Sequence, residues 1–255
     1  MKRTFFWLLI LAFCAALAYE PSAQGQQPQT EAKSQTAPPK FDMEPYQLGL
    51  LRKGPNHGTG PKEEGEKIQA GHMANIGKMA QAGKLIAAGP MMDDGELRGI
   101  FLFKAASLDE AKTLAAEDPA IKAGRLKLDL YTWMGPKGIG TKLNEQYRKD
   151  PGVKMTMTKY HFALLKRAPN ATVGSSPTDQ KLLLDHLWSI RRMMDEGKMP
   201  AAGPLADAGD LAGIFVFATE SMDEAKAWAN TDPMVKAGRM AAEIHPWFVA
   251  REVWP

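Results

Sequence analysis

Two histidines and two aspartates stand at matching intervals in this chain and could carry out acid–base chemistry. The interval from His72 to Asp118 equals the interval from His186 to Asp232. A carboxylate that orients an imidazole and stabilises its cationic form turns the histidine into a general base. We therefore predict two catalytic pairs, His72 with Asp118 and His186 with Asp232, that act as acid and base on a small organic substrate.

Each of these residues also has a plainer alternative role. His72 is flanked by Ile68 and Ile76 at helical spacing, so a buried imidazole bonded to a backbone carbonyl would fit equally well. Asp118 and Asp232 each precede a proline, which is typical of a helix N-cap followed by the first helical residue. Since a cap needs only one carboxylate oxygen, capping a helix and orienting a histidine can coexist. The sequence leaves these roles open.

Two tyrosines and two arginines are further candidates for substrate binding. Tyr46 and Tyr160 begin predicted strands and could place a hydroxyl group at a barrel mouth, although packing is the commoner role of a strand tyrosine. Arg125 and Arg239 follow glycines of predicted turns and could hold an acidic substrate, with a solvated surface charge as the alternative.

The composition argues against a metal, another cofactor or a nucleic-acid partner. The only cysteine, Cys14, lies in an apolar N-terminal run, so the mature chain offers no thiolate ligand. The 5 histidines contain one matched pair, and the chain has no glycine-rich phosphate loop and no His-Glu-x-x-His motif. The formal net charge is only +3, and no basic block remains that could follow a phosphate backbone.

The matched residues belong to an internal repeat. Residues 46–134 align with residues 160–248 without a gap, and about 36 of 89 positions are identical. A repeat unit of about 90 residues has the size of a small domain rather than of a solenoid repeat. The sequence therefore predicts a duplicated domain.

Both copies predict the same order of elements. Apolar runs predict strands, glycines end the first helices, and a Ser-x-x-Glu capping box begins each second helix. The Gly-Pro pairs that end residues 87–90 and 201–204, together with Gly99 and Gly213, are interpreted as turn residues, and Trp133 and Trp247 as core residues. The predicted elements are strands at 46–51, 99–104 and 126–134 and a helix at 62–82, with counterparts at 160–165, 213–218, 240–249 and 177–196.

This order is the α+β, ferredoxin-like split arrangement, βαββαβ. Helices cover one face of such a sheet, and a second copy of the sheet can cover the other face. We therefore predict tandem ferredoxin-like repeats, at 44–135 and 159–251, that form an intrachain dimeric α/β barrel with a linker at 136–158. A higher oligomer of this intrachain pseudo-dimer is also compatible with the sequence.

The N-terminus predicts export. A basic start and an apolar run over residues 5–18, too short for a comfortable bilayer span, indicate a signal peptide at 1–18. Cleavage after Ala18 or Ala23 would give a periplasmic or secreted protein without a membrane partner, and an uncleaved anchor is the alternative. Residues 19–43, rich in Gln, Pro, Thr and Ser, predict a disordered tether.

Taken together, these motifs resemble the YCII-related family. The resemblance rests on a helix histidine, a segment ending in Gly-Pro, a Ser-x-Glu-Glu-Ala-like helix start and an Asp-Pro followed by a small-Gly turn. These are His72 and residues 83–90, 107–111 and 118–124, and then His186 and residues 197–204, 221–225 and 232–238. The resemblance implies a dimeric α/β barrel and a histidine–aspartate pair with an enzymatic role, and some relatives have a dehydrohalogenase-like lyase activity.

The leading interpretation is an exported tandem YCII-related protein that uses its His–Asp pairs in lyase- or hydrolase-like chemistry. A non-catalytic module that binds a small molecule or supports assembly is the alternative. Cofactor-free turnover of electron-rich aromatic compounds, as in other dimeric α/β barrels, is a third hypothesis.

Overall fold

A computed structural model describes residues 37–255 except 151, 170–175 and 207. Each repeat contains four strands, one long helix and two shorter helices. The first repeat comprises β1 (Met43–Lys53), α1 (Lys62–Gln81), β2 (Leu85–Pro90), β3 (Leu97–Phe103), α2 (Leu108–Ala116), α3 (Pro119–Lys122) and β4 (Leu126–Pro136). The second comprises β5 (Met157–Arg167), α5 (Pro177–Asp195), β6 (Ala201–Ala206), β7 (Leu211–Phe217), α6 (Met222–Ala229), α7 (Pro233–Lys236) and β8 (Met240–Ala250). Helix α4 (Thr141–Lys149) lies between the repeats, and a 3-10 turn, η1 (Arg251–Val253), follows β8.

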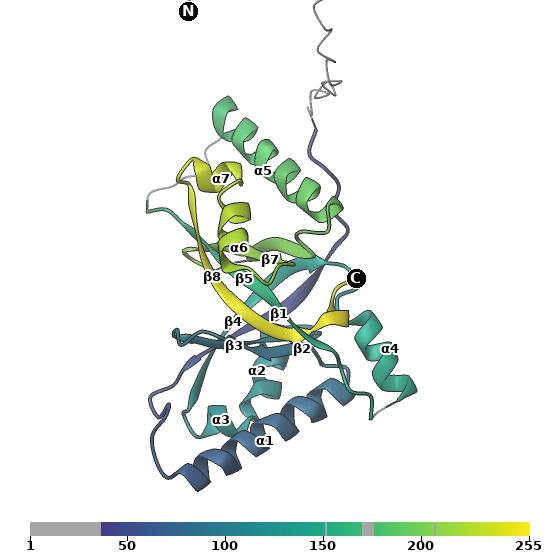
Figure 1. The fold of residues 1–255 in the computed structure, drawn as a ribbon, viewed down its shortest axis with the longest axis vertical. Helices are drawn as coiled ribbons and strands as arrows, with labels where there is room; N and C mark the ends of the chain where they lie inside the picture. The colour runs from purple at the N-terminus through teal and green to yellow at the C-terminus, as the bar shows by residue number, and fades with distance from the viewer. Residues whose placement is uncertain (1–36, 151, 170–175, 207) are drawn as a thin grey trace, which may run out of the picture. The chain divides into compact units, whose positions relative to one another are not determined.

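The strands form one antiparallel, 8-stranded sheet in the order β2-β3-β1-β4-β6-β7-β5-β8 (Figure 1). The two repeats meet where β4 pairs with β6, through Trp133 and Leu205. At the other end of the sheet, Met91 bridges to Trp247 of β8, so the sheet closes into a barrel. These two junctions involve equivalent residues of the two repeats, which confirms the predicted intrachain barrel of two ferredoxin-like units.

Glycines allow the repeats to approach each other at these junctions. The prediction that the Gly-Pro pairs form turns is wrong, because Gly89 lies in β2 and Gly203 in β6. A Cβ atom on Gly89 would lie 1.9 Å from the carbonyl oxygen of Phe248, and one on Gly203 would lie 1.8 Å from that of Met134. Side chains are therefore excluded where the backbone of one repeat crosses the other.

Gly99 and Gly213, also predicted as turn residues, lie inside β3 and β7. A Cβ on Gly99 would lie 2.9 Å from the carbonyl oxygen of Gly89, and one on Gly213 would lie 2.5 Å from that of Gly203. Glycine is thus needed for strand pairing next to each junction rather than for a change of chain direction.

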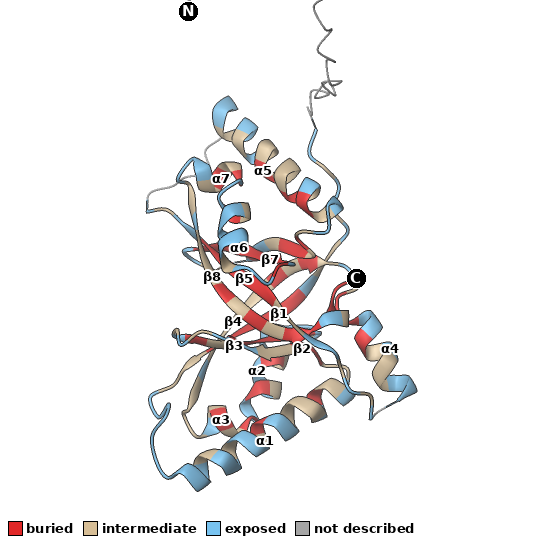
Figure 2. Ribbon diagram, viewed as in Figure 1, coloured by how far each residue is buried: buried red, intermediate tan, exposed pale blue. Residues whose placement is uncertain are grey.

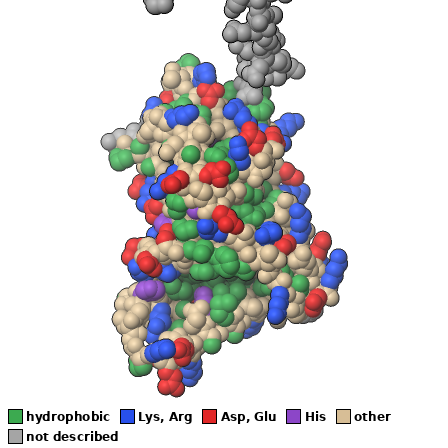
Figure 3. All heavy atoms as spheres, in the orientation of Figure 1, with side chains coloured by type: hydrophobic (Ala, Val, Ile, Leu, Met, Phe, Trp, Pro, Cys, Tyr) green, Lys and Arg blue, Asp and Glu red, His purple; other side chains and the backbone are tan. Residues whose placement is uncertain are grey.

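The hydrophobic residues form three clusters, and the largest fills the barrel with side chains from both repeats. Trp133 and Trp247, each 1% exposed, belong to it, as predicted. The other two clusters lie between the outer face of each half-sheet and its helices. Figure 2 shows the buried residues concentrated on the strands, and Figure 3 shows hydrophobic side chains gathered between the two helical layers. Each layer of helices therefore has a core of its own.

The connection between the repeats is more ordered than the predicted linker at 136–158. It contains α4, whose Leu143 is buried, and the backbone N–H of Gly140 donates to the carbonyl of Val253 at 2.7 Å. Helix α4 has little apolar content, but Leu143 and Tyr147 stand at helical spacing on it.

The predicted signal peptide at 1–18 and most of the predicted tether lie outside the described residues. Within the described part of the chain, no helix has the length and apolar character needed to span a bilayer.

Candidate functional site

The structure brings His186 and Asp232 together on the outer face of the second half-sheet. His186 projects from α5, and Asp232 is the N-cap of α7. One carboxylate oxygen accepts hydrogen bonds from the backbone N–H groups of Met234 and Val235, at 2.9 and 3.3 Å. The other lies 2.7 Å from Nδ1 of His186. The aspartate therefore caps the helix and orients the histidine at the same time.

The first repeat contains the same arrangement. Nδ1 of His72 lies 2.8 Å from Oδ2 of Asp118, and the backbone N–H of Ala120 donates to Oδ1 at 2.9 Å. The side-chain amide of Asn75 adds a donor to Oδ2 at 3.3 Å. Burial raises the pKa of the Asp118 carboxyl, but hydrogen bonding and charge from His72 and the N–H of Ala120 outweigh burial, so the pKa lies below its ordinary value.

Both imidazole rings are largely buried but are not closed off. His72 is 9% exposed and His186 is 8% exposed, and each ring lies against a phenylalanine of the sheet, Phe101 or Phe215. Among the described residues, neither Nε2 atom has a hydrogen-bond partner. Neither Nε2 atom is fully buried. Each Nε2 therefore retains some contact with solvent-accessible space.

In the second repeat that space is a cavity of about 290 Å³ between α5 and the sheet. Its walls are mainly apolar, and His186 lies among them together with Arg167, Asp179 and Arg239. The apolar lining comprises Phe41, Met43, Leu165, Leu182, Leu183, Leu187, Ile190, Ala202, Gly203, Pro204, Ala212, Gly213, Phe215, Met234 and Met240. A cavity of this volume can accommodate a small organic molecule.

One wall of this cavity comes from the segment that precedes the first repeat. The indole N–H of Trp188 donates to the carbonyl of Ala37 at 3.0 Å, and Arg191 reaches the carbonyl of Lys40 at 3.4 Å. Phe41 packs on the hydrophobic cluster of the second repeat. The predicted disordered tether at 19–43 is therefore wrong for its last residues, because an aromatic residue there docks on α5.

The equivalent segment, which precedes the second repeat, is more exposed. Phe41 and Met43 correspond to Met155 and Met157 in the repeat alignment. Met157 is 38% exposed, whereas Met43 lines the cavity. The two His–Asp pairs are thus similar in geometry but differ in their surroundings.

Replacing Phe41 by alanine should weaken binding of an uncharged apolar probe, 4-phenylbutanol, by about fivefold, because the cavity loses an aromatic wall. Isothermal titration calorimetry measures this change. The matched control is Met155→Ala, which alters the equivalent residue of the first repeat and should leave the affinity unchanged. Equal affinities of Phe41→Ala and the wild-type protein would show that the segment does not enclose the ligand.

The structure does not bring the two candidate tyrosines to either histidine. Tyr46 is fully buried inside the barrel, where its hydroxyl lies 2.6 Å from the carboxylate of Glu44 and accepts from the N–H of Ile139 at 3.0 Å. Burial and the neighbouring carboxylate raise the pKa of Tyr46 above its ordinary value. Tyr160 also lies in the barrel, packed edge to face on Trp254. Alternation along β1 and β5 points both side chains away from the outer face.

The two candidate arginines occupy different environments. The guanidinium group of Arg125 donates to the carbonyl of Thr59 at 2.7 Å, which ties down the loop before α1. Arg239 lines the cavity of the second repeat and forms an ion pair with Asp179 at 3.1 Å. Of the four predicted substrate-binding residues, Arg239 is the one that the structure places beside His186.

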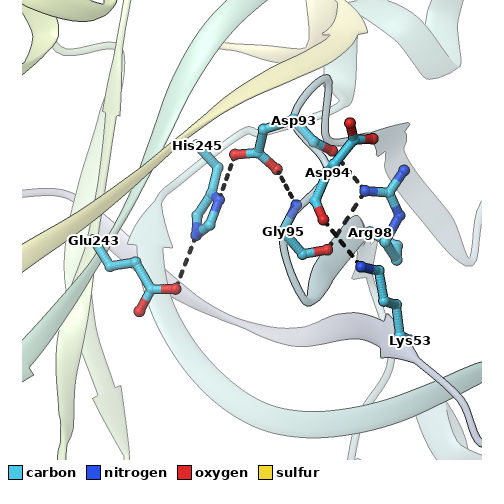
Figure 4. Close-up of polar contacts among 7 residues, drawn as sticks. All are labelled: Lys53, Asp93, Asp94, Gly95, Arg98, Glu243 and His245. Atoms are coloured by element: carbon cyan, nitrogen blue, oxygen red, sulfur yellow. Dashed lines mark hydrogen bonds and ion pairs between the residues drawn. The ribbon is translucent and has the colours of Figure 1, made fainter.

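A histidine bridge between the repeats was missed by the sequence analysis. Figure 4 shows His245 of β8 between Asp93, from the loop after β2, and Glu243. The distances from its ring nitrogens to these carboxylates are 2.7 and 3.1 Å. Burial raises the pKa of Glu243, but hydrogen bonds from Lys166 and His245 outweigh it and hold the pKa below its ordinary value. The counterpart of His245 is Tyr131, so His245 is not a repeated residue and the repeat does not point to the bridge.

His161 provides a test of how pH affects stability. It is 1% exposed, its Nδ1 contacts the carbonyl of Thr219 at 2.9 Å, and burial lowers its pKa. Because the pKa is lower in the folded protein, the folded state favours the neutral imidazole. The resulting stability is fully present above the unfolded pKa of about 6.5 and is lost as the pH falls, when the unfolded chain takes up the proton more readily.

Replacing His161 by glutamine, the residue at the equivalent position 47, should therefore reduce the loss of stability between pH 7.5 and pH 5. Urea denaturation at both pH values measures the difference. Parallel losses in the variant and the wild-type protein would contradict the prediction.

Within the described residues, no group of three or more His, Cys, Asp and Glu side chains is arranged to hold a metal ion. The cavity of the second repeat offers one histidine, one carboxylate already paired with an arginine, and two arginines. Its lining suits an organic molecule better than a cation.

Comparison with known protein families matches the sequence of both repeats to one family. The YCII-related domain matches twice, over residues 48–133 and 160–247, which together make up more than half of the chain. The chain belongs to the YCII-related family. Both matches lie inside the repeats predicted from the sequence, and each contains one complete His–Asp pair of this YCII-related protein. No curated protein sequence matches the chain significantly.

Solved structures with similar folds include mutant forms of chlorite dismutase from Candidatus Nitrospira defluvii. One, in complex with cyanide, is 12% identical, covers 81% of this chain and 90% of its own, and has a TM-score of 0.52. A second mutant is 11% identical, covers 83% and 92%, and has a TM-score of 0.51. At this identity the similarity of the YCII-related protein to chlorite dismutase is one of fold.

Proposed function

We propose that the cavity of the second repeat is an active site, in which His186 transfers a proton to or from a small, mainly apolar organic compound. The observation that carries this proposal is the position of His186, which lines a cavity of about 290 Å³ while its Nδ1 lies 2.7 Å from Asp232. His186 and Asp232 both lie within the second match to the YCII-related domain.

The carboxylate selects the form of the imidazole that can act as a base. With Nδ1–H donating to Asp232, the lone pair of a neutral ring resides on Nε2. When Nε2 accepts a proton, the carboxylate stabilises the imidazolium ion. The backbone N–H groups of Met234 and Val235 fix the carboxylate, so it does not need to reorganise during the transfer.

The lining favours proton transfer over covalent catalysis. Among the described residues that line the cavity there is no Ser, Thr, Cys, Tyr or Lys. The usual hydroxyl, thiol and amine nucleophiles are thus missing from this part of the site, and His186 is the group suited to remove a proton. Elimination from a carbon acid and attack by an activated water are both compatible with one general base, in keeping with lyase- or hydrolase-like chemistry.

Proton abstraction can be tested without knowledge of the natural substrate. The protein is incubated in D₂O with small carbonyl and halogenated compounds, and NMR follows exchange of their acidic C–H protons and the appearance of elimination or hydrolysis products. We expect exchange or turnover of at least one compound that also binds in the cavity. Binding without exchange or turnover for every compound would support the alternative, a non-catalytic module that binds a small molecule.

A further inference from the structure

The charges around the cavity indicate what kind of molecule it holds. We infer that the ligand of the second repeat is an apolar organic anion, with its acidic group held by Arg167 and Arg239 and its apolar body against the walls near His186. This inference deepens the proposed function and rests on it for the identity of the site.

The lining of the cavity is apolar except for a few charged groups. Apart from His186, the charged residues are Arg167, Arg239 and Asp179. Asp179 pairs with Arg239 at 3.1 Å, so the lining carries one more cationic than anionic side chain. A ligand with an apolar body and one negative charge satisfies both the walls and this excess charge.

Arg167 is the source of the excess charge. Its Nη1 atom donates to the carbonyl oxygens of Gly209 and Leu211, both at 2.6 Å. These neutral acceptors hold the guanidinium group without neutralising it, and no carboxylate of the described residues forms an ion pair with it. An anchored guanidinium with further N–H donors is well suited to bind a carboxylate.

The equivalent position of the first repeat lacks this property. Lys53 corresponds to Arg167, and its amine lies 3.8 Å from the carboxylate of Glu96 and 3.0 Å from the carbonyl of Asp94. The cation of the first repeat thus has an acidic neighbour, Glu96, from the loop that precedes β3. In the second repeat, Arg167 lines the apolar cavity, and within the described part of the chain none of its hydrogen bonds is to a carboxylate.

Arg239, whose charge is paired with Asp179, contributes orientation. Its ion pair with Asp179 holds the side chain between α5 and the start of β8, at the edge of the cavity that also contains Arg167. Two guanidinium groups on one cavity disfavour a cationic ligand and favour an anion. A ligand held in this way by its acidic group would have its orientation fixed relative to His186.

Three probes that share one apolar body test the inference by calorimetric titration at low salt: 4-phenylbutyrate, 4-phenylbutanol and 4-phenylbutylamine. We expect the anion to bind about tenfold more tightly than the alcohol, because a charge-assisted hydrogen bond to a guanidinium group is stronger than a neutral one. The amine should bind most weakly. Equal affinities for the three probes would overturn the inference.

Substitutions test which residue causes the preference for the anion over the alcohol. Arg167→Gln should remove most of the advantage of the anion over the alcohol, while Lys53→Gln, the matched change in the first repeat, should keep it. Arg167→Lys retains the charge and should keep part of the advantage, which guards against a folding defect of the glutamine variant. An anion preference that survives Arg167→Gln in a folded protein would contradict the assignment.

A final comparison separates this inference from the proposed function. His186→Asn should keep the order anion, alcohol, amine, because the arginines remain in place. Loss of proton exchange with an unchanged order of binding supports both statements. A wild-type protein that prefers the anion but catalyses no exchange would contradict the proposed function alone.

Discussion

Replacing His186 by asparagine is expected to lower turnover in the cavity of the second repeat by about 10²–10⁴-fold, the usual contribution of a general acid or base. Asparagine can still donate a hydrogen bond to Asp232, but its amide cannot accept a proton near neutral pH. The fold should therefore change little while proton transfer is lost. Steady-state kinetics on a compound identified by NMR exchange measures the effect.

The matched variant is His72→Asn in the first repeat. His72 has an equivalent aspartate partner, but the apolar cavity lies beside His186. We expect His72→Asn to retain most of the turnover of the wild-type protein. A larger loss in His72→Asn than in His186→Asn would assign the reaction to the first repeat and contradict the proposal.

The second large effect is expected on stability, from Gly203→Ala and Gly89→Ala. The added methyl group would lie 1.8 or 1.9 Å from a backbone carbonyl oxygen of the other repeat. Because a backbone atom cannot rotate away as a side chain can, the repeats must separate locally. The carbonyl oxygens of Gly203 and Gly89 accept the indole N–H groups of Trp133 and Trp247, each at 3.2 Å, so these bonds weaken as well when the glycine backbone shifts. We expect a loss of about 3 kcal/mol or more in the free energy of unfolding.

Thermal denaturation should show this loss as a fall in Tm of about 6–12 °C for a domain of this size. The control is Gly77→Ala, in the middle of α1, where an added Cβ would have no neighbour within 4 Å. That change should stabilise the protein by about 0.5–1 kcal/mol, since alanine favours a helix more than glycine does. If Gly203→Ala were as stable as Gly77→Ala, the crossing would be looser than the structure indicates.

Local patterns in the sequence were sufficient to predict most of the fold and the His–Asp geometry. Asp118 and Asp232 could be placed because an Asp-Pro pair fixes a helix N-cap, and helical spacing fixes the face that carries each histidine. The repeat then indicated that a bare sheet face would be covered by a second copy. These inferences depend on contacts within one repeat or on its symmetry.

The errors concern contacts between segments that are distant in the chain. Gly89 and Gly203 resemble turn glycines in the sequence, because the carbonyl oxygen that excludes a side chain belongs to the other repeat. For Tyr46 the structure shows the packing alternative rather than a hydroxyl at the barrel mouth, because sequence alternation does not show how far along the barrel a side chain lies. The bridge at His245 escaped notice because it has no repeated counterpart.

The wall supplied by Phe41 has a consequence for the order in which the site is made. The contact between Ala37 and Trp188 joins residues 151 positions apart, and the wall is synthesised long before α5. Since a chain emerges from the ribosome starting at its N-terminus, the segment that contains Phe41 can pack only after α5 has been synthesised. A product truncated before α5 would contain the wall without the cavity, and a fragment beginning at β5 would contain the cavity with one side open. The complete cavity is therefore a property of the finished polypeptide, and the second repeat produced separately would lack the wall that Phe41 and Met43 supply.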